Sequence, residues 1–408
     1  MLELMCKNAR KASLALASSD TEKRNCALNA MADALVARAS EIIEANKNDL
    51  ARATENGMSD AMIDRLTLNI DRIKAISNSV KKVIALPDPL AKSEEWTREN
   101  GLKITKKRVP FGVIAIIYEA RPNVTADAAA LCVKSGNAVI LRGGKEAIDS
   151  NLAIASVLSD ALYSVGLPKE CVAVVPDTSR ETASKLMKMK GHIDLLIPRG
   201  GKSLIRSVVE NATVPVIETG AGNCHVFFDE SADFEMALNV IDNAKRQRPS
   251  VCNAAESLLV HESIARDILP KVKARLDNIE LRGCDRTCEI IEVNKATEED
   301  FFTEYNDYIL TVKVVSDVNE AISHINLHGT GHSEAIITEN QENASLFCAS
   351  VDAAAVYVNA STRFTDGEEF GFGAEIGIST QKMHARGPMG LPEMTTYKYL
   401  ISGNGQIR

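Results

Sequence analysis

The sequence predicts an α/β protein built on parallel β-sheets. Short, continuously apolar runs at Val113–Tyr118 and Ala138–Leu141 are typical of buried strands, and residues 125–135 between them have a helical pattern. A second alternating block begins near Val214 and continues to about Val358. Strands that alternate with helices at this spacing pair in parallel and are covered on both faces. The length of 408 residues favours two or three domains.

The first hundred residues are expected to be mainly helical. Leu28, Met31, Leu35 and Ile42 fall near one helical stripe, and Gly57 is a plausible helix stop. The two prolines of residues 86–90 then break the helical pattern. The basic stretch Lys103–Val109 alternates in the manner of an exposed strand.

Further strand–helix units are expected after residue 141. A helix over about 147–165, a strand at Val172–Val175, a helix to about residue 190 and a strand at Leu195–Ile197 follow in turn. Ligands of such sheets bind beyond the carboxyl ends of the strands. The loops expected there are 119–125, 142–145, 176–179 and 198–203. From Ser361 onward the chain is rich in glycine, and we expect loops with a few short strands.

The composition excludes several classes of function. With 47 basic and 55 acidic residues, the formal net charge is −8, which argues against nonspecific nucleic-acid or anionic-membrane binding. No apolar run is long enough for a signal peptide or a membrane span. The nine cysteines are odd in number and scattered, so we expect reduced thiols and a cytoplasmic protein.

Several familiar motifs fail on inspection. Gly201-Lys202-Ser203 would end a P-loop, but that motif requires glycine where Leu196 stands. Gly220-Ala221-Gly222 lacks the third glycine of the dinucleotide fingerprint, because His225 occupies that position. No metal site is expected: glycines interrupt any helix that would align His324, His328 and His332, and Cys284 and Cys288 lack a second pair at zinc-finger spacing.

Cys252 is the best candidate for a nucleophile. Three basic residues, Lys245, Arg246 and Arg248, precede it closely, and positive charge lowers the pKa of a thiol. Pro249 and Ser250 indicate a turn, which would let the thiol face a cleft. The alternative, a buried structural cysteine, stays open on spacing alone.

The chain as a whole resembles the aldehyde dehydrogenase superfamily, and within it the branch that reduces an acyl phosphate. The resemblance is carried by seven long segments that span the chain. These are residues 109–127, 134–144, 214–225, 247–253, 324–334, 359–367 and 371–387.

The resemblance implies an NADPH-dependent reduction of L-glutamyl 5-phosphate to L-glutamate 5-semialdehyde and phosphate, the second step of proline biosynthesis from glutamate. Cys252 would attack the acyl phosphate and form a thioester, which hydride then reduces. The alternative within the same superfamily is a nonphosphorylating, NAD(P)-dependent semialdehyde dehydrogenase. A catalytically inactive binding protein is the third hypothesis, and the presence of the nucleophile argues against it.

The resemblance also assigns roles to individual residues. Asn123 would stabilise the oxyanion. Glu218 matches the general base of the superfamily; in this reaction it would either accept and return the proton of the cysteine thiol or have a structural role. Arg142, Gly143, Gly144 and Lys145 would contact the adenosine ribose, where a lysine favours the 2′-phosphate of NADPH. The other implied residues are Arg199, Gly200, Gly201 and Glu304 for the cofactor, and Arg121 and Arg363, with Arg246 and Arg248 as alternatives, for the substrate anions.

The implied architecture is aldehyde-dehydrogenase-like, with two Rossmann-like parallel-sheet domains. Residues 1–101 and 113–220 would form the cofactor-binding domain and 221–380 the catalytic domain. Residues 102–112 and 381–408 would form a small oligomerisation element, so a homo-oligomer is expected. L-glutamyl 5-phosphate is the expected substrate, and glutamate kinase, which would supply it, is a possible partner.

Overall fold

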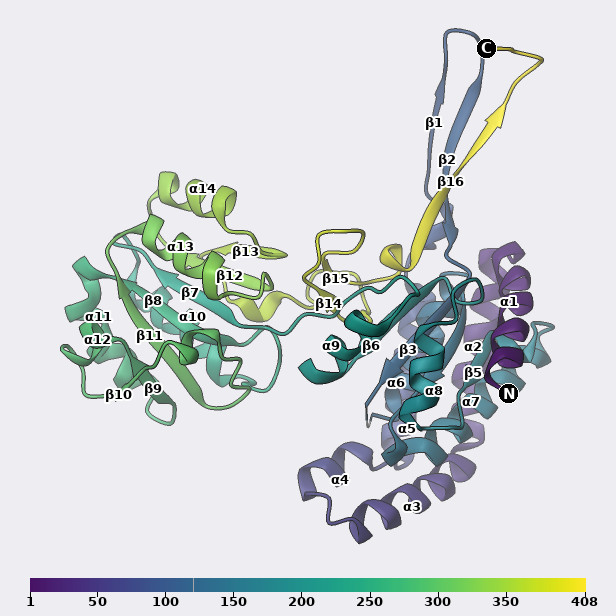
Figure 1. The fold of residues 1–408 in the computed structure, drawn as a ribbon, viewed down its shortest axis with the longest axis horizontal. Helices are drawn as coiled ribbons and strands as arrows, with labels where there is room; N and C mark the ends of the chain where they lie inside the picture. Colours follow the sequence, from purple (N-terminus) through teal and green to yellow (C-terminus); the bar gives the residue numbers. More distant parts are fainter. Residues whose placement is uncertain (120) are drawn as a thin grey trace. The chain divides into compact units, whose positions relative to one another are not determined.

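The computed structural model describes residues 1–119 and 121–408, and within them the chain divides into two compact units (Figure 1). Unit 1 comprises residues 1–218, 371–377 and 389–408. Unit 2 comprises residues 219–370 and 378–388. Each unit contains one parallel sheet with helices packed on it, so the predicted α/β class with two parallel sheets is confirmed.

The sheet of unit 1 has four parallel strands in the order β5-β4-β3-β6. Every residue of β3 is buried, as expected for an apolar strand with a parallel neighbour on each side. The strands are β3 (Val113–Tyr118), β4 (Ala138–Arg142), β5 (Val172–Val174) and β6 (Leu195–Arg199).

Nine described helices belong to unit 1. Helix α1 contacts β3, β4 and β5, whereas α2 packs against α5, α6 and α7 in a further layer. Side chains cap several helices, for example Asp20, which accepts a hydrogen bond from the amide of Lys23. The helices are α1 (Leu2–Ser18), α2 (Thr21–Ala37), α3 (Ala39–Glu55), α4 (Asp60–Leu66), α5 (Ile70–Ala85), α6 (Asn123–Lys134), α7 (Ile148–Ser164), α8 (Arg180–Met187) and α9 (Lys202–Asn211).

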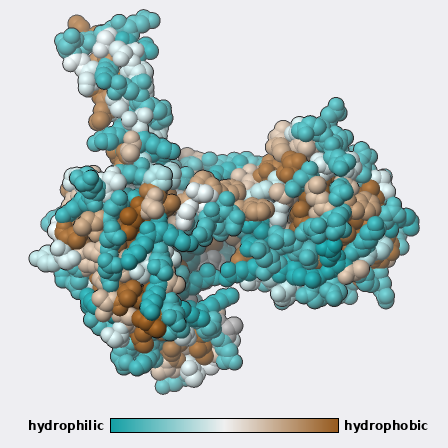
Figure 2. Space-filling model, turned by 180° about the vertical axis from the view of Figure 1, so that it is seen from behind, coloured by the Kyte–Doolittle hydropathy of each residue, from teal (hydrophilic) through white to brown (hydrophobic). Residues whose placement is uncertain are grey.

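A three-stranded antiparallel sheet, which we call the arm, projects from the rest of unit 1 (Figure 1). Its order is β1 (Ser93–Thr97), β2 (Lys103–Pro110), β16 (Thr395–Ser402). Apolar residues lie among hydrophilic ones on its surface (Figure 2), with Ile401 64% and Tyr397 54% exposed. The basic stretch forms a strand, as predicted, but it is the central strand of the arm and most of its residues are half-buried rather than exposed, because β1 and β16 pair on either side of it.

The arm differs from the predicted oligomerisation element at both of its ends. Strand β1 was expected in the cofactor domain, but it pairs with β2 along its whole length. Residues 381–388 were expected in the oligomerisation element, but they group with unit 2, where Gly387–Pro388 (β15) pairs with Ile378–Ser379 (β14). The C-terminal region also contains an eight-residue strand, β16, where only short strands were expected.

The sheet of unit 2 has seven parallel strands in the order β10-β9-β11-β8-β7-β12-β13. One face packs on α10 and α11 through residues such as Val226 and Leu258, and the other packs on α13 and α14 through Phe227 and Leu259. The strands are β7 (Cys224–Phe228), β8 (Ala255–His261), β9 (Glu280–Gly283), β10 (Asn294–Lys295), β11 (Ile309–Val315), β12 (Ser333–Ile337) and β13 (Ala355–Val358). The helices are α10 (Phe234–Arg246), α11 (Glu262–Arg275), α12 (Asp285–Cys288), α13 (Val318–His328) and α14 (Gln341–Ser350).

Among the residues described, none of the helices combines the length and apolar character that crossing a membrane requires.

Candidate active site

The predicted cofactor residues of unit 1 meet at one edge of its sheet. Arg142 ends β4 and pairs in register with Ile117, and Arg199 ends β6 and pairs with Tyr118. Because all four strands are parallel, their carboxyl ends and the loops that follow lie at the same edge. The predicted loops therefore follow the strands as expected, but they are shorter than predicted: α6 begins at Asn123, β6 continues to Arg199 and α9 begins at Lys202. Residue 120 of the first loop lies outside the described residues.

The side chain of Arg142 is hydrogen-bonded to the loop that follows β5. Its Nη2 donates to the carbonyl oxygens of Thr178 and Ser179, the latter at 3.4 Å. Burial lowers the pKa of Arg142, and the carboxylates of Glu146 and Asp177 oppose that shift. The side chain of Lys145, three residues on, is exposed.

Glu119 organises the loop that follows β6. The amide of Gly201, just before α9, donates to Oε2 of Glu119 at 3.1 Å. A Cβ atom at Gly200 would lie 2.6 Å from Cδ of Glu119, so only glycine fits there without movement. Sequence reasoning selected the glycines of this loop but not the glutamate against which they pack.

Asn123 lies at the first position of α6, with an exposed side chain. Its Nδ2 donates to Oδ2 of Asp127 at 3.1 Å. Burial raises the pKa of Asp127 to about 6, although the bond from Asn123 and the charge of Arg199 lower it in part. Asp127 is thus a further polar group at this edge that the sequence did not single out.

Glu218 ends the first segment of unit 1 and is half-buried. The segment before it continues the sheet: the amide of Ile217 donates to the carbonyl of Leu196 at 3.0 Å, and Val216 bridges Leu196 in parallel. Arg121 is exposed. Cys252, Glu304 and Arg363 belong to unit 2, so the predicted site residues are divided between the two units.

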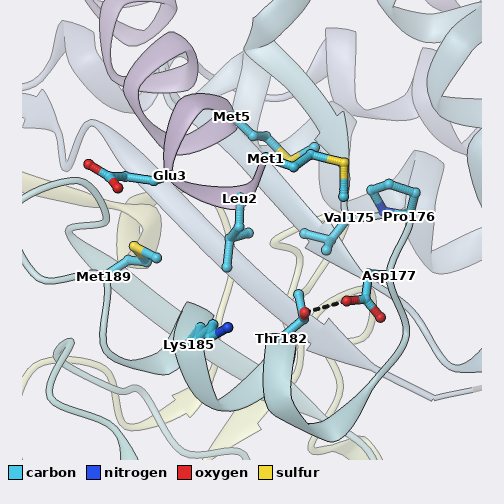
Figure 3. Close-up of a pocket in the computed structure, with 10 residues that line it drawn as sticks. All are labelled: Met1, Leu2, Glu3, Met5, Val175, Pro176, Asp177, Thr182, Lys185 and Met189. Atoms are coloured by element: carbon cyan, nitrogen blue, oxygen red, sulfur yellow. Dashed lines mark hydrogen bonds between the residues drawn. The ribbon is translucent and has the colours of Figure 1, made fainter.

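A cavity of about 340 Å³ in unit 1 borders the loop after β5 to which Arg142 is bonded (Figure 3). It is bounded by the start of α1, the segment after β5 and α8, and a hydrogen bond of 2.5 Å joins Thr182 to Asp177 at its wall. Its lining residues are Met1, Leu2, Glu3, Met5, Val175, Pro176, Asp177, Thr182, Lys185 and Met189. None of the residues predicted to act in the reaction is among them.

In unit 2, Cys252 lies in the turn between α10 and β8 and is half-buried. Helix α10 ends at Arg246, and Pro249 follows, which cannot continue a helix. The predicted turn at Cys252 is therefore confirmed. No disulfide joins any of the nine cysteines, all of which the structure describes.

Gly222 lies directly against the Cys252 turn. A Cβ atom at Gly222 would overlap the carbonyl group of Cys252 and come within 2.8 Å of its Cα. The amide of Gly222 donates to Oε1 of Glu304 at 2.7 Å. Glu304 therefore binds the backbone of the glycine that packs on Cys252, and its contact with a cofactor stays a prediction.

Two of the three basic residues expected to act on the Cys252 thiol are paired elsewhere. The Nζ of Lys245 lies 2.5 Å from Oε2 of Glu256, and both side chains are fully buried. Arg246 forms ion pairs with Asp242 and Asp277. Carboxylates thus pair with both of these cations, and their effect on the pKa of the Cys252 thiol stays a prediction.

Arg363 interacts electrostatically with Cys252. Burial and then the nearby charge of Arg248 lower its pKa, whereas the charges of Asp366 and Cys252 raise it. Its Nε donates to Gln247 at 3.0 Å, and its Nη1 donates to Oδ1 of Asn253. Arg363 and Arg248 therefore bring two guanidinium groups to the Cys252 turn.

A second thiol, which the sequence did not single out, lies behind Cys252. The buried Sγ of Cys224 is 3.2 Å from the carbonyl oxygen of Cys252 and 3.8 Å from Nδ1 of His332. Burial raises the pKa of Cys224 well above its usual value, so it remains a neutral thiol. Burial also lowers the pKa of His332 to about 4.

The histidines at four-residue spacing have packing roles, as expected. His324 and His328 stack on α13 with ring centroids 4.0 Å apart, and His332 lies beyond the helix, where it contacts Ser333. Within the described residues, no group of three or more histidine, cysteine or carboxylate side chains is arranged to hold a metal ion.

Comparison with known proteins identifies the class to which this fold and site belong. Residues 2–307 match the model of the aldehyde dehydrogenase family. The chain therefore belongs to the aldehyde dehydrogenase family, and the resemblance inferred from the sequence is confirmed.

Within that family, the chain is similar along its whole length to proteins named gamma-glutamyl phosphate reductase. It is 58% identical to that of Thermoanaerobacter pseudethanolicus, over 100% of this chain and 99% of the other. It is 59% identical to that of Clostridium beijerinckii, over 100% of both. The crystal structure of the Thermotoga maritima protein superposes with a TM-score of 0.99 at 50% identity, covering 100% of this chain and 99% of the other.

Proposed function

We propose that this chain reduces L-glutamyl 5-phosphate with NADPH to L-glutamate 5-semialdehyde and phosphate, the second step of proline biosynthesis. The observation that carries the proposal is the half-buried Cys252 in its turn, with Arg363 interacting with the thiol and Arg248 beside Arg363. A thiol is a suitable nucleophile for an acyl group, and two guanidinium groups match an anionic substrate.

In this proposal the Cys252 thiolate attacks the carbonyl carbon of the acyl phosphate. The C–O bond to phosphate breaks, phosphate departs and a thioester remains on Cys252. NADPH, when bound, supplies the hydride that reduces the thioester carbonyl. The resulting thiohemiacetal on Cys252 collapses to the aldehyde, and the sulfur is released for another turnover.

Asn123 would donate its side-chain amide to the oxyanion that forms on the acyl carbonyl. Its exposed position at the start of α6 and its bond to Asp127 support this role, because the bond fixes the side chain. Replacing Asn123 with alanine should lower kcat by about 100-fold to 1,000-fold, as for other oxyanion donors. Glu218, half-buried, would take up or return the thiol proton.

The edge of the unit 1 sheet fits an anionic dinucleotide. Lys145 supplies an exposed cation there, and Gly200 leaves the backbone accessible where a side chain would not fit. We propose that Arg142, Gly143, Gly144 and Lys145 hold the adenosine ribose phosphate of NADPH, with Arg199, Gly200, Gly201 and Glu304 completing the cofactor site.

Arg363 and Arg121 would bind the substrate anions. For Arg363 this is supported by its electrostatic interaction with Cys252. For Arg121 it is supported by its exposed position in the loop after β3. The reaction requires a reduced Cys252, which is consistent with a cytoplasmic protein. We further propose that the arm joins copies of this chain, and that glutamate kinase is a partner that supplies the unstable acyl phosphate.

The reverse reaction tests the proposal. Oxidation of glutamate 5-semialdehyde should produce NADPH from NADP⁺ only when phosphate or arsenate is present. Undiminished oxidation without either anion would overturn the proposal in favour of a nonphosphorylating semialdehyde dehydrogenase.

The nucleophile is tested separately. Cys252→Ser should abolish turnover, whereas Cys348→Ser, at an exposed cysteine of α14, should leave it unchanged. Full turnover in Cys252→Ser would refute the assignment of Cys252.

A further inference from the structure

A buried ion pair closes the base of the Cys252 turn. Lys245 lies in the last turn of α10, before Cys252, and Glu256 lies in β8, after it. Their Nζ and Oε2 atoms are 2.5 Å apart and both side chains are fully buried. The two ends of the segment that carries Cys252 are therefore tied to each other directly.

The same carboxylate also reaches the segment that carries Glu304. Oε1 of Glu256 accepts a hydrogen bond from the amide of Asn306 at 3.1 Å. Asn306 has a φ of 56°, in the left-handed region that few residues other than glycine adopt. The bond therefore supports a strained backbone only two residues from Glu304.

Glu304 completes a closed path back to the nucleophile candidate. Its Oε1 accepts from the amide of Gly222 at 2.7 Å, and Gly222 packs on the backbone of Cys252. The path runs Lys245, Glu256, Asn306, Glu304, Gly222, all within unit 2. Asn306 and Glu304 are linked along the backbone, and the other links are an ion pair and hydrogen bonds.

Stability alone does not account for this pair. Burying two charges is costly, and well-packed apolar residues in place of a buried ion pair often give equal or greater stability. Consistent with that cost, burial raises the pKa of Glu256 to about 7 and lowers the pKa of Lys245, while their mutual attraction opposes both shifts. The pair is therefore better explained by what it positions.

We propose that Lys245 and Glu256 are positioning residues, which together fix the Cys252 turn and, through Asn306, the carboxylate of Glu304. The proposal rests on Cys252 as the nucleophile of the proposed function. It assigns no contact with substrate to either residue.

Two double variants separate the ion pair from the hydrogen bond to Asn306. Lys245→Met with Glu256→Gln removes the ion pair but keeps a side-chain oxygen that can accept a hydrogen bond from the amide of Asn306. Lys245→Met with Glu256→Leu removes both the ion pair and that hydrogen bond. We expect kcat to fall at least about tenfold in each, and the KM for NADPH to rise at least about threefold only in the second.

The reactivity of the Cys252 thiol provides a readout that does not depend on turnover. The rate of its alkylation by iodoacetamide, followed by mass spectrometry of the labelled peptide, should change at least about fivefold in both variants. Alkylation of the exposed Cys348 should be unchanged. A matched control is a largely buried ion pair of unit 1, Arg24 and Asp88, whose variant Arg24→Met/Asp88→Asn should keep kcat and Cys252 alkylation within twofold.

The proposal is overturned if the folded double variants retain both kcat and the Cys252 alkylation rate within twofold. Circular dichroism establishes that they fold; if they do not, the isosteric Glu256→Gln decides by the same two measurements. If Cys252→Ser keeps its turnover, the proposed function fails, but the alkylation rates still report on whether the pair positions the turn.

Discussion

The amide of Gly222 donates to the carboxylate of Glu304 at 2.7 Å, so the glutamate assigned to the cofactor ribose also holds the glycine that packs on Cys252. One carboxylate oxygen of Glu304 thus binds the protein backbone. A displacement of Gly222 would be transmitted to both residues.

Gly222→Ala should disable the enzyme without unfolding it. The added methyl group would overlap the carbonyl of Cys252 and push the turn aside. Because displacements of about 1 Å at a reacting group can cost roughly 100-fold in rate, we expect a loss of kcat of that order. Steady-state kinetics and circular dichroism check this, and a folded variant with wild-type kcat would contradict the packing described.

Lys145→Glu should shift the cofactor preference from NADPH toward NADH. A glutamate repels the 2′-phosphate and can accept from a 2′-hydroxyl, so the ratio of kcat/KM for the two cofactors should fall at least about tenfold. Lys74→Glu makes the same charge change at an exposed position of α5 and should leave the ratio unaltered. An unchanged ratio in Lys145→Glu would count against the assignment of Lys145.

Asp127→Asn should stabilise the chain at neutral pH but not in acid. Burial raises the pKa of Asp127 from 3.8 to about 6 in the folded state. The folded chain therefore binds more protons than the unfolded chain between these values, and this carboxyl lowers stability as pH rises through that window. Above it the variant should gain about 1–3 kcal/mol in the free energy of unfolding.

Urea unfolding at pH 4 and pH 7.5 measures this effect. The wild type and Asp127→Asn should have nearly equal urea midpoints at pH 4, and the variant should have the higher midpoint at pH 7.5. If the variant is more stable by the same amount at both pH values, removal of the charge is not the cause.

His324 should make the chain less stable as the pH falls below 6.5. Burial, followed by the charges of His225, His328 and Lys313, lowers the pKa of His324 to about 2. Between pH 6.5 and pH 2 the histidine is protonated in the unfolded chain but stays neutral in the folded chain. The free energy of unfolding therefore decreases as the pH falls. Once the unfolded histidine is fully protonated, the decrease is about 1.4 kcal/mol per pH unit. In urea unfolding, the free energy of unfolding of His324→Gln should decrease less steeply between pH 6 and pH 4.5 than that of the wild type. The same pH dependence in both would show that His324 does not cause the loss of stability.

The sequence predicted the fold well where local patterns determine it. Val113–Tyr118 could only be a buried strand, and the proline at 249 had to interrupt the chain before Cys252. The predicted loops after β3, β4 and β6 lie at one edge because parallel strands place them there.

What the sequence could not predict were pairings between distant residues. The positive charge of Lys245 seemed available to Cys252, but Glu256 on the next strand binds it. Arg363, more than a hundred positions away, interacts with the thiol instead. The role of Glu119 beside Gly200 and the assignment of β1 to the arm depend likewise on tertiary contacts that no local pattern encodes.

Strand β16 pairs along its full length with β2, so two neighbouring strands of the arm come from segments far apart in the sequence, residues 395–402 and 103–110. Contacts between such distant segments form slowly, because a long intervening stretch must close first. Until β16 pairs, one edge of β2 has unpaired backbone groups to which another strand can bind. Mispairing during folding should therefore begin at the arm.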